Sequence, residues 1–164
     1  LPTIGGGLGL DLEVYGVTLG VSCSYQIGGY GYDVTYMALM DDNQVGNHNW
    51  HKDMLNSWTE NNTKTDIPAL TNGQYPSYAN AGSDRFLTSN SFFSLNNVQL
   101  GYSFPKKLIE KIKLDKLNLY VSASNLAIAT ARKGYNPMTS FSGSSNSYQY
   151  TPLSTVMGGI KLQF

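Results

Sequence analysis

The sequence has one cysteine, Cys23, and little charge for its length. A single cysteine forms no internal disulfide and no zinc site by itself. Charged residues make up 13% of the 164 residues, against roughly 25% in an average soluble domain. The 11 basic residues balance the 11 acidic ones, which argues against a nucleic-acid-binding surface. With 41% apolar residues, intrinsic disorder is a poor fit as well.

Long apolar runs are also missing. No stretch approaches the ~18 continuous apolar residues of a membrane-spanning helix, which excludes a helical membrane protein. The first residues, Leu1–Gly5, lack the basic and apolar regions of a signal peptide. A transmembrane β-barrel is not excluded, because its strands alternate apolar and polar residues and therefore contain no such run.

Alternation of apolar and polar residues is the dominant pattern, and it predicts five strands. The alternating segments are 7–15, 17–27, 92–104, 117–124 and 155–164. The first two flank Tyr15-Gly16, which is typical of an antiparallel hairpin. Phe93 and Leu95 are out of phase with Val98, which predicts a β-bulge near Asn96-Asn97. The only predicted helix is a short connector over 106–111.

Two long segments do not alternate. Residues 28–90 and 131–150 greatly exceed the usual loop of roughly 4–6 residues, so each is functional or disordered. The aromatic content of the first segment favours an ordered, packed loop.

The composition of the two strand faces favours a membrane barrel over a soluble sandwich. The polar face carries Thr, Ser, Asn, Gln and Gly rather than Lys and Glu, and the other face carries Leu, Val and Ile. We therefore expect lipid-facing side chains at Leu19, Val21, Leu119, Val121, Ile160 and Leu162. We expect lumen-facing side chains at Ser22, Gln99, Ser122 and Lys161. Because bacterial barrels start at about eight strands, five strands form part of a longer barrel or one chain of a split one.

Several segments in order resemble one transporter family. These are "TDIPAL" at 65–70, "SDRFL" at 83–87, "SLNNVQLGYSFP" within 92–105, "LYVSASNL" at 119–126 and "GYNP" at 134–137. They resemble the C-terminal region of SusC/RagA-type TonB-dependent outer-membrane transporters, over roughly residues 5–164. The resemblance implies a fold of C-terminal antiparallel strands of a large transmembrane β-barrel, with about 22 strands and a plugged lumen.

The resemblance also implies a function and partners. Such transporters import glycans or peptides, contact TonB through an N-terminal part, and pair with a SusD-like surface lipoprotein that lids the barrel. The plug domain and the TonB-contacting segment are not among residues 1–164, so this chain is expected to be a fragment that transports nothing alone.

The expected topology places both long loops together. With a periplasmic C-terminus in the bacterial outer membrane, the connector 105–115 is periplasmic and the loops 28–90 and 131–150 are extracellular. Aromatic side chains bury large areas at low entropic cost, so those in the loops are candidates for ligand or lid contact: Trp50, Trp58, Tyr75, Tyr78, Tyr135, Tyr148 and Tyr150.

Motifs for other chemistry are weak. His48 and His51 lack an obvious third metal ligand, and Asp41-Asp42-Asn43 lacks the EF-hand spacing. The carboxylates Asp11 and Glu13 lie on the polar face and fit hydrogen bonding to a plug or neighbour better than catalysis. We expect no enzyme, no metal and no cofactor. The alternative function is a soluble, aromatic-rich β-domain that binds carbohydrate.

Overall fold

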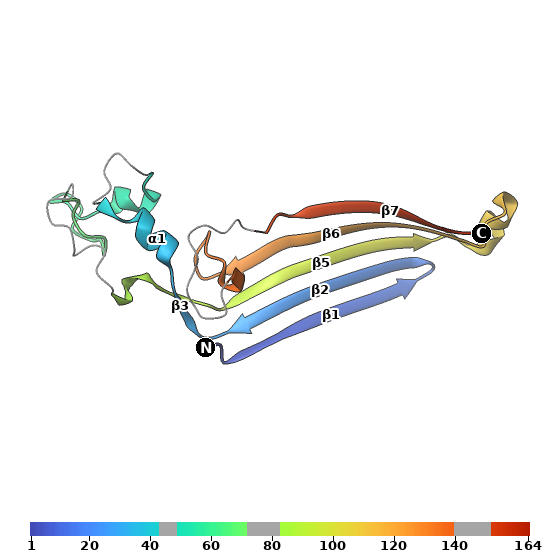
Figure 1. Ribbon diagram of the computed structural model, residues 1–164, viewed down its shortest axis with the longest axis horizontal. Helices are drawn as coiled ribbons and strands as arrows, with labels where there is room; N and C mark the ends of the chain where they lie inside the picture. Colours follow the sequence, from blue (N-terminus) through green and yellow to red (C-terminus); the bar gives the residue numbers. More distant parts are fainter. Residues whose placement is uncertain (43–48, 72–82, 140–151) are drawn as a thin grey trace.

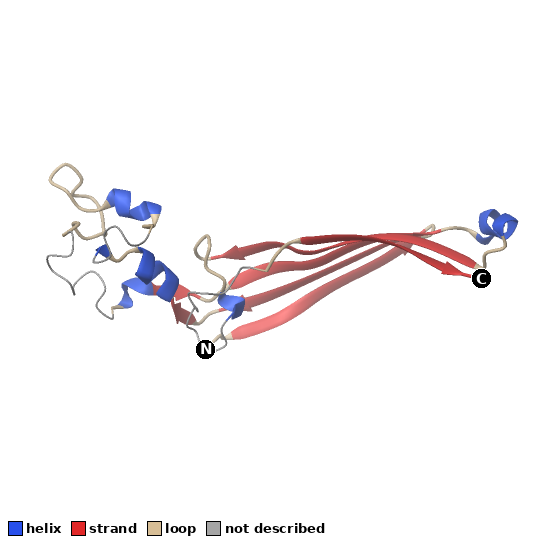
Figure 2. Ribbon diagram, turned by 45° about the horizontal axis from the view of Figure 1, so that its top comes forward, coloured by secondary structure: helices blue, strands red, loops and turns tan. Residues whose placement is uncertain are grey.

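A computed structural model describes residues 1–42, 49–71, 83–139 and 152–164. Its main element is a single antiparallel sheet with the strand order β1-β2-β5-β6-β7. The strands are β1 (Ile4–Val14), β2 (Val17–Ile27), β5 (Phe92–Ser103), β6 (Lys116–Thr130) and β7 (Thr155–Gln163). The sheet is one layer thick, as both views show (Figures 1 and 2). The all-β prediction is confirmed, and all five predicted strands are present.

The two ends of the sheet differ. At one end, here called the turn end, lie the β1–β2 hairpin and a connector of α2 (Lys106–Ile109) and η4 (Glu110–Ile112) (Figure 1). The predicted short helix is thus confirmed. The opposite, loop end carries β3 (Tyr30–Tyr32), α1 (Val34–Leu39), η2 (Lys52–Asn56), η3 (Asp84–Phe86), β4 (Leu87–Ser89) and η5 (Pro137–Thr139).

The hairpin turn depends on a glycine. Tyr15 and Gly16 have φ values of 50° and 84°, as a two-residue turn of type I′ requires. A Cβ on Gly16 would lie 2.7 Å from the carbonyl oxygen of Ser103, so only glycine fits beside β5.

The predicted bulge is confirmed. Ser22 pairs with Asn97 and Cys23 pairs with Leu95, so Asn96 is the extra residue on β5. The bulge restores the phase between the two halves of β5, and it keeps the apolar residues on one face along the whole strand.

The segment 28–90 is more structured than its sequence pattern predicts. It contains α1 and the two-stranded β3–β4 sheet, although no helix was expected there. Asp33 begins α1 by accepting a hydrogen bond from the Tyr36 amide at 2.9 Å, which is an ordinary N-cap. Six residues are too few for a helix that is stable alone, so tertiary contacts sustain it. The expectation of an ordered, packed loop is confirmed for its described residues.

The buried apolar residues lie outside the main sheet. Met40, Met54, Ile67 and Phe86 form the core of the loop end, here called the loop core. At the turn end, Ile109 and Leu114 are buried. Within the described residues, no helix has the length and apolar composition needed to cross a membrane.

Candidate functional site: a two-faced sheet and an anchored loop cluster

One face of the sheet is apolar across all five strands. The register aligns Leu12, Leu19, Leu100 and Val121 side by side. Leu100 and Val121 are each 54% exposed. All the residues expected to face lipid lie on this face: Leu19, Val21, Leu119, Val121, Ile160 and Leu162. A continuous exposed apolar surface of this kind marks contact with lipid or with another protein.

The opposite face is mostly polar and carries few charges. One row across it consists of Asp11, Gly20, Gln99, Ser122 and Met157. Gln99 is exposed, whereas Ser122 is only 6% exposed. The residues expected to face the lumen all lie on this face: Ser22, Gln99, Ser122 and Lys161. Whether it borders a lumen stays a prediction.

Glycines let neighbouring side chains lie flat on this polar face. A Cβ on Gly159 would come within 2.4 Å of the ring of Tyr120, and a Cβ on Gly101 within 2.4 Å of the Thr18 hydroxyl. Tyr120 and Thr18 therefore fold down over the adjacent strand.

Trp50, one of the residues expected to contact a ligand or lid, packs against the loop core. Trp50 is partly buried against it, and its indole Nε1 has no hydrogen-bond partner among the described residues. Trp58 is 43% exposed, and its amide donates to the Ile67 carbonyl at 2.9 Å. Of these two tryptophans, only Trp58 presents a large surface to solvent.

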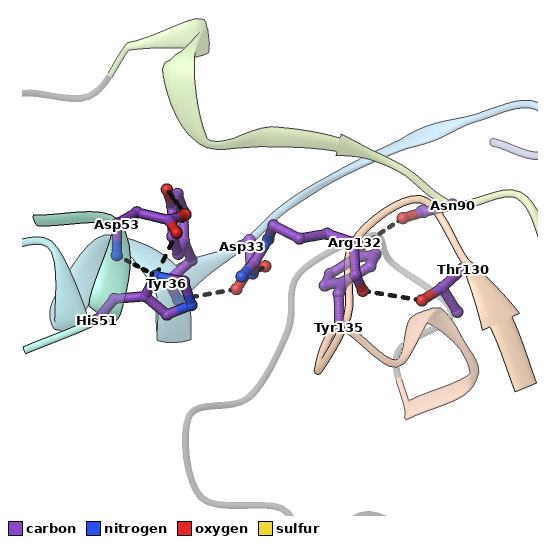
Figure 3. Close-up of polar contacts among 8 residues, drawn as sticks. All are labelled: Asp33, Tyr36, His51, Asp53, Asn90, Thr130, Arg132 and Tyr135. Atoms are coloured by element: carbon purple, nitrogen blue, oxygen red, sulfur yellow. Dashed lines mark hydrogen bonds and ion pairs between the residues drawn. The ribbon is translucent and has the colours of Figure 1, made fainter. Parts of the chain in front are cut away.

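A buried ion pair joins the loop core to the segment after β6 (Figure 3). Asp33, 1% exposed, pairs with the guanidinium of Arg132. The same guanidinium lies 4.0 Å from the centroid of the Tyr36 ring, which is a cation–π contact. Arg132 lies two residues after the end of β6 at Thr130, so this contact, here called the anchor, fixes the loop core to the sheet.

Further polar contacts extend the anchor on both sides (Figure 3). The Tyr135 hydroxyl donates to Asn90 Oδ1, and the Thr130 hydroxyl donates to the Arg132 carbonyl at 2.9 Å. The Tyr36 hydroxyl donates to Asp53 Oδ2 at 2.9 Å. Tyr135, a candidate contact residue, is thus only 5% exposed in this structure.

Burial dominates the ionisation of this cluster. It raises the pKa of the Tyr36 hydroxyl to about 12, and the hydrogen bond to Asp53 adds to the effect. Burial also raises the pKa of Tyr135 and lowers that of Arg132, while the attraction between these two residues opposes both shifts. Both tyrosines therefore stay neutral hydrogen-bond donors at physiological pH, and Arg132 keeps its charge.

Metal chemistry has little support in the described residues. Their His, Cys, Asp and Glu side chains form no group of three or more that could hold an ion. His51 Nδ1 accepts from the Asp53 amide at 3.2 Å, and Asp42 accepts from the amide and hydroxyl of Thr71 at 2.8 and 2.7 Å. The other candidates lie outside the described residues: Asn43, His48, Tyr75, Tyr78, Tyr148 and Tyr150.

The chain is similar in sequence to curated proteins, and similar in sequence and fold to solved structures. No family model matches the chain. "TonB-dependent receptor P3" of Formosa agariphila is 28% identical over 142 residues, which cover 85% of this chain and 13% of that protein. "TonB-dependent receptor P39" of the same organism is 31% identical over 85 residues, covering 48% of this chain and 8% of that protein. The chain therefore spans only a small part of these relatives.

Solved structures extend the similarity to the whole chain. The RagAB peptide importer in its "closed-closed" state matches with a TM-score of 0.80 and 30% identity, over 100% of this chain and 17% of that one. Its "open-open" state matches with a TM-score of 0.77 and 31% identity over the same shares. The chain has the sequence and the fold of a SusC/RagA-type TonB-dependent transporter segment.

The segment thus belongs to a family whose named members are TonB-dependent receptors and a peptide importer. The names of its relatives describe receptors and importers, not enzymes. Asp33 and Arg132 of the anchor, and Asn90 beside it, were not predicted as functional. The only local sequence signal was Asp33, an acidic residue just before a short helix. Its partner Arg132 is far away in the sequence, so no local pattern could reveal the ion pair.

Proposed function

We propose that this chain forms part of the wall of a TonB-dependent importer, and that the whole protein takes up peptides or oligosaccharides. The observation that carries the proposal is the division of one single-layered sheet into an exposed apolar face and a neutral polar face. A soluble carbohydrate-binding domain would cover its apolar face with a second layer. In lipid, Leu100 and Val121 need no cover.

The sheet is proposed to continue into further strands of a longer protein. Among the described residues, no strand pairs with the outer edges of β1 and β7. Unpaired backbone groups in lipid cost several kcal/mol each by a rough estimate. The share of the RagAB chain that is matched, 17%, fits a piece of the barrel, with a plug and a TonB-contacting part elsewhere in the full-length protein.

We place the turn end in the periplasm, with the C-terminus, and the loop end outside the cell. Outer-membrane barrels have short periplasmic turns and longer extracellular loops, and the segments at 28–90 and 131–150 are the long ones here. The loop core then lies where a SusD-like lipoprotein would dock. The exposed Trp58 is a candidate for contact with that lid.

Blocking the lumen by a label tests the proposal. Ser22 and Val21 are neighbours on opposite faces of β2. In full-length protein with Cys23→Ser, a bulky water-soluble thiol reagent should label Ser22→Cys and reduce the uptake of fluorescent peptides and oligosaccharides. Val21→Cys should neither be labelled nor lose uptake.

Energy coupling gives the second measurement. Uptake should stop when the proton-motive force is dissipated, because TonB transmits that energy. Equal labelling of both cysteines, or uptake that continues without the proton-motive force, would contradict the proposal.

A further inference from the structure

The polar face carries a branched aliphatic side chain, Ile128, near the loop end. Ile128 pairs with Ser94, and Ser94 pairs with Ser24, which places Ile128 on the face of Ser22 and Gln99. Ile128 is 37% exposed and Leu126 is 39% exposed. Ile128 is thus a branched aliphatic side chain in a row that otherwise consists of Gly7, Ser24 and Ser94.

Leu126 and Ile128 line a pocket. It has a volume of about 230 Å³ and is formed where the segment after β6 folds back beside the end of the strand (Figure 1). Here it is called the rim pocket. Its wall includes Leu126, Ile128, Met138, Asn125, Asn136 and Ser94. Met138, in η5, is 52% exposed and adds a thioether to the apolar part of the lining.

Hydrogen bonds hold the residues of the pocket wall in position. The Ser154 hydroxyl donates to the Asn125 carbonyl at 2.7 Å, and Asn125 Nδ2 donates to the Leu153 carbonyl at 3.3 Å. The Met138 amide donates to Asn136 Oδ1 at 3.0 Å. The anchor holds the same segment at Arg132. The rim pocket is therefore built from both β6 and a tethered loop.

The chemistry of the rim pocket selects one kind of ligand. Among the described residues, its lining has no charged side chain, so none of them matches a carboxylate, an amine or a phosphate. The described lining has no aromatic side chain either, so it offers no ring on which a sugar could stack. Its volume is below the ~300–1,000 Å³ of pockets that enclose a whole small molecule. The aliphatic side chains of Leu126 and Ile128 and the thioether of Met138 instead fit a single aliphatic side chain of a ligand.

We propose that the rim pocket takes a single aliphatic side chain of a peptide substrate as it enters the lumen. This inference rests on the proposed import function and deepens it, because it makes peptides the substrate class. The amide and hydroxyl groups at the pocket edge suit a neutral peptide backbone, and the apolar wall suits leucine, isoleucine or valine.

Binding of matched peptides to the purified full-length transporter tests this inference. The probes are fluorescent synthetic peptides of identical length that differ only in one leucine or one asparagine. The wild type should bind the leucine peptide about tenfold more tightly, which corresponds to about 1.4 kcal/mol. Ile128→Asn and Met138→Gln should abolish that preference and leave the affinity for the asparagine peptide unchanged.

Ala129→Asn is the matched control, because Ala129 pairs with Phe93 on the apolar face and lies outside the rim pocket. Both pocket positions are substantially exposed, so their substitution removes no core packing. Peptide uptake without a leucine preference, a preference that survives both substitutions, or binding of oligosaccharides alone would each overturn the inference while import stands. Loss of uptake and of energy coupling in the wild type would instead refute the proposed function.

Discussion

Leu100→Arg in the full-length protein should destabilise the folded barrel by up to about 2–4 kcal/mol, which is the cost of arginine on a lipid-facing strand at the bilayer midplane and falls toward the interfaces. Leu100 lies on the apolar face, three residues before β5 ends at Ser103, and is 54% exposed. Gln99→Arg, one residue away on the polar face, should cost far less. Denaturant unfolding of the protein in lipid vesicles measures both values.

This neighbouring pair is a better comparison than one that uses Ser122. Ser122 is only 6% exposed, so arginine there would add a packing penalty unrelated to lipid. Gln99 is exposed and accepts a longer side chain. Equal destabilisation by Leu100→Arg and Gln99→Arg would show that the two faces have the same surroundings.

Arg132→Met should release the loop core from the sheet. It removes the countercharge that Arg132 gives to Asp33, and breaking a buried ion pair in this way costs about 3–5 kcal/mol. The Arg132 side chain is 26% exposed, so we expect the low end of that range. Hydrogen exchange at the amides of Tyr36 and Met37 in α1, and of Met40 at its C-terminal end, should become roughly 100-fold faster.

Two comparisons make this experiment specific. Lys133→Met removes the same charge from the exposed next residue and should leave exchange unchanged. The double variant Asp33→Asn with Arg132→Met should lose less stability than the sum of the single variants, since asparagine still caps α1. Additive losses, or α1 exchange that does not respond to Arg132→Met, would show that the anchor does not hold the loop core.

The sheet was predictable because the alternation of apolar and polar residues within each strand indicates which side chains share a face. Period-two alternation placed β2 at its observed bounds, and the phase error between Leu95 and Val98 located the bulge at Asn96. β6 was predicted too short: beyond Ser124 it continues through Ile128 to Thr130, where both faces carry small or apolar residues and the alternation fades.

The loop end was less predictable because its structure depends on distant contacts. α1 has six residues, and its apolar side chains pack on Phe86, which is separated from it by most of the long loop. The ion pair joins Asp33 to Arg132, and three strands, β4, β5 and β6, lie between these two residues in the sequence. Aromatic content alone could not separate Trp50, which packs on the loop core, from Trp58, which is exposed.

Residue-by-residue accessibility along β6 tests the two-faced wall most directly. A nitroxide is placed in turn at each residue from Asn118 to Ala123 in the full-length transporter, with Cys23→Ser, in lipid vesicles. Relaxation by oxygen, which concentrates in lipid, should peak at Leu119, Val121 and Ala123. Relaxation by a water-soluble nickel chelate should be higher at the residues between them. Similar accessibility to both reagents at all six positions would contradict a wall between lipid and an aqueous lumen.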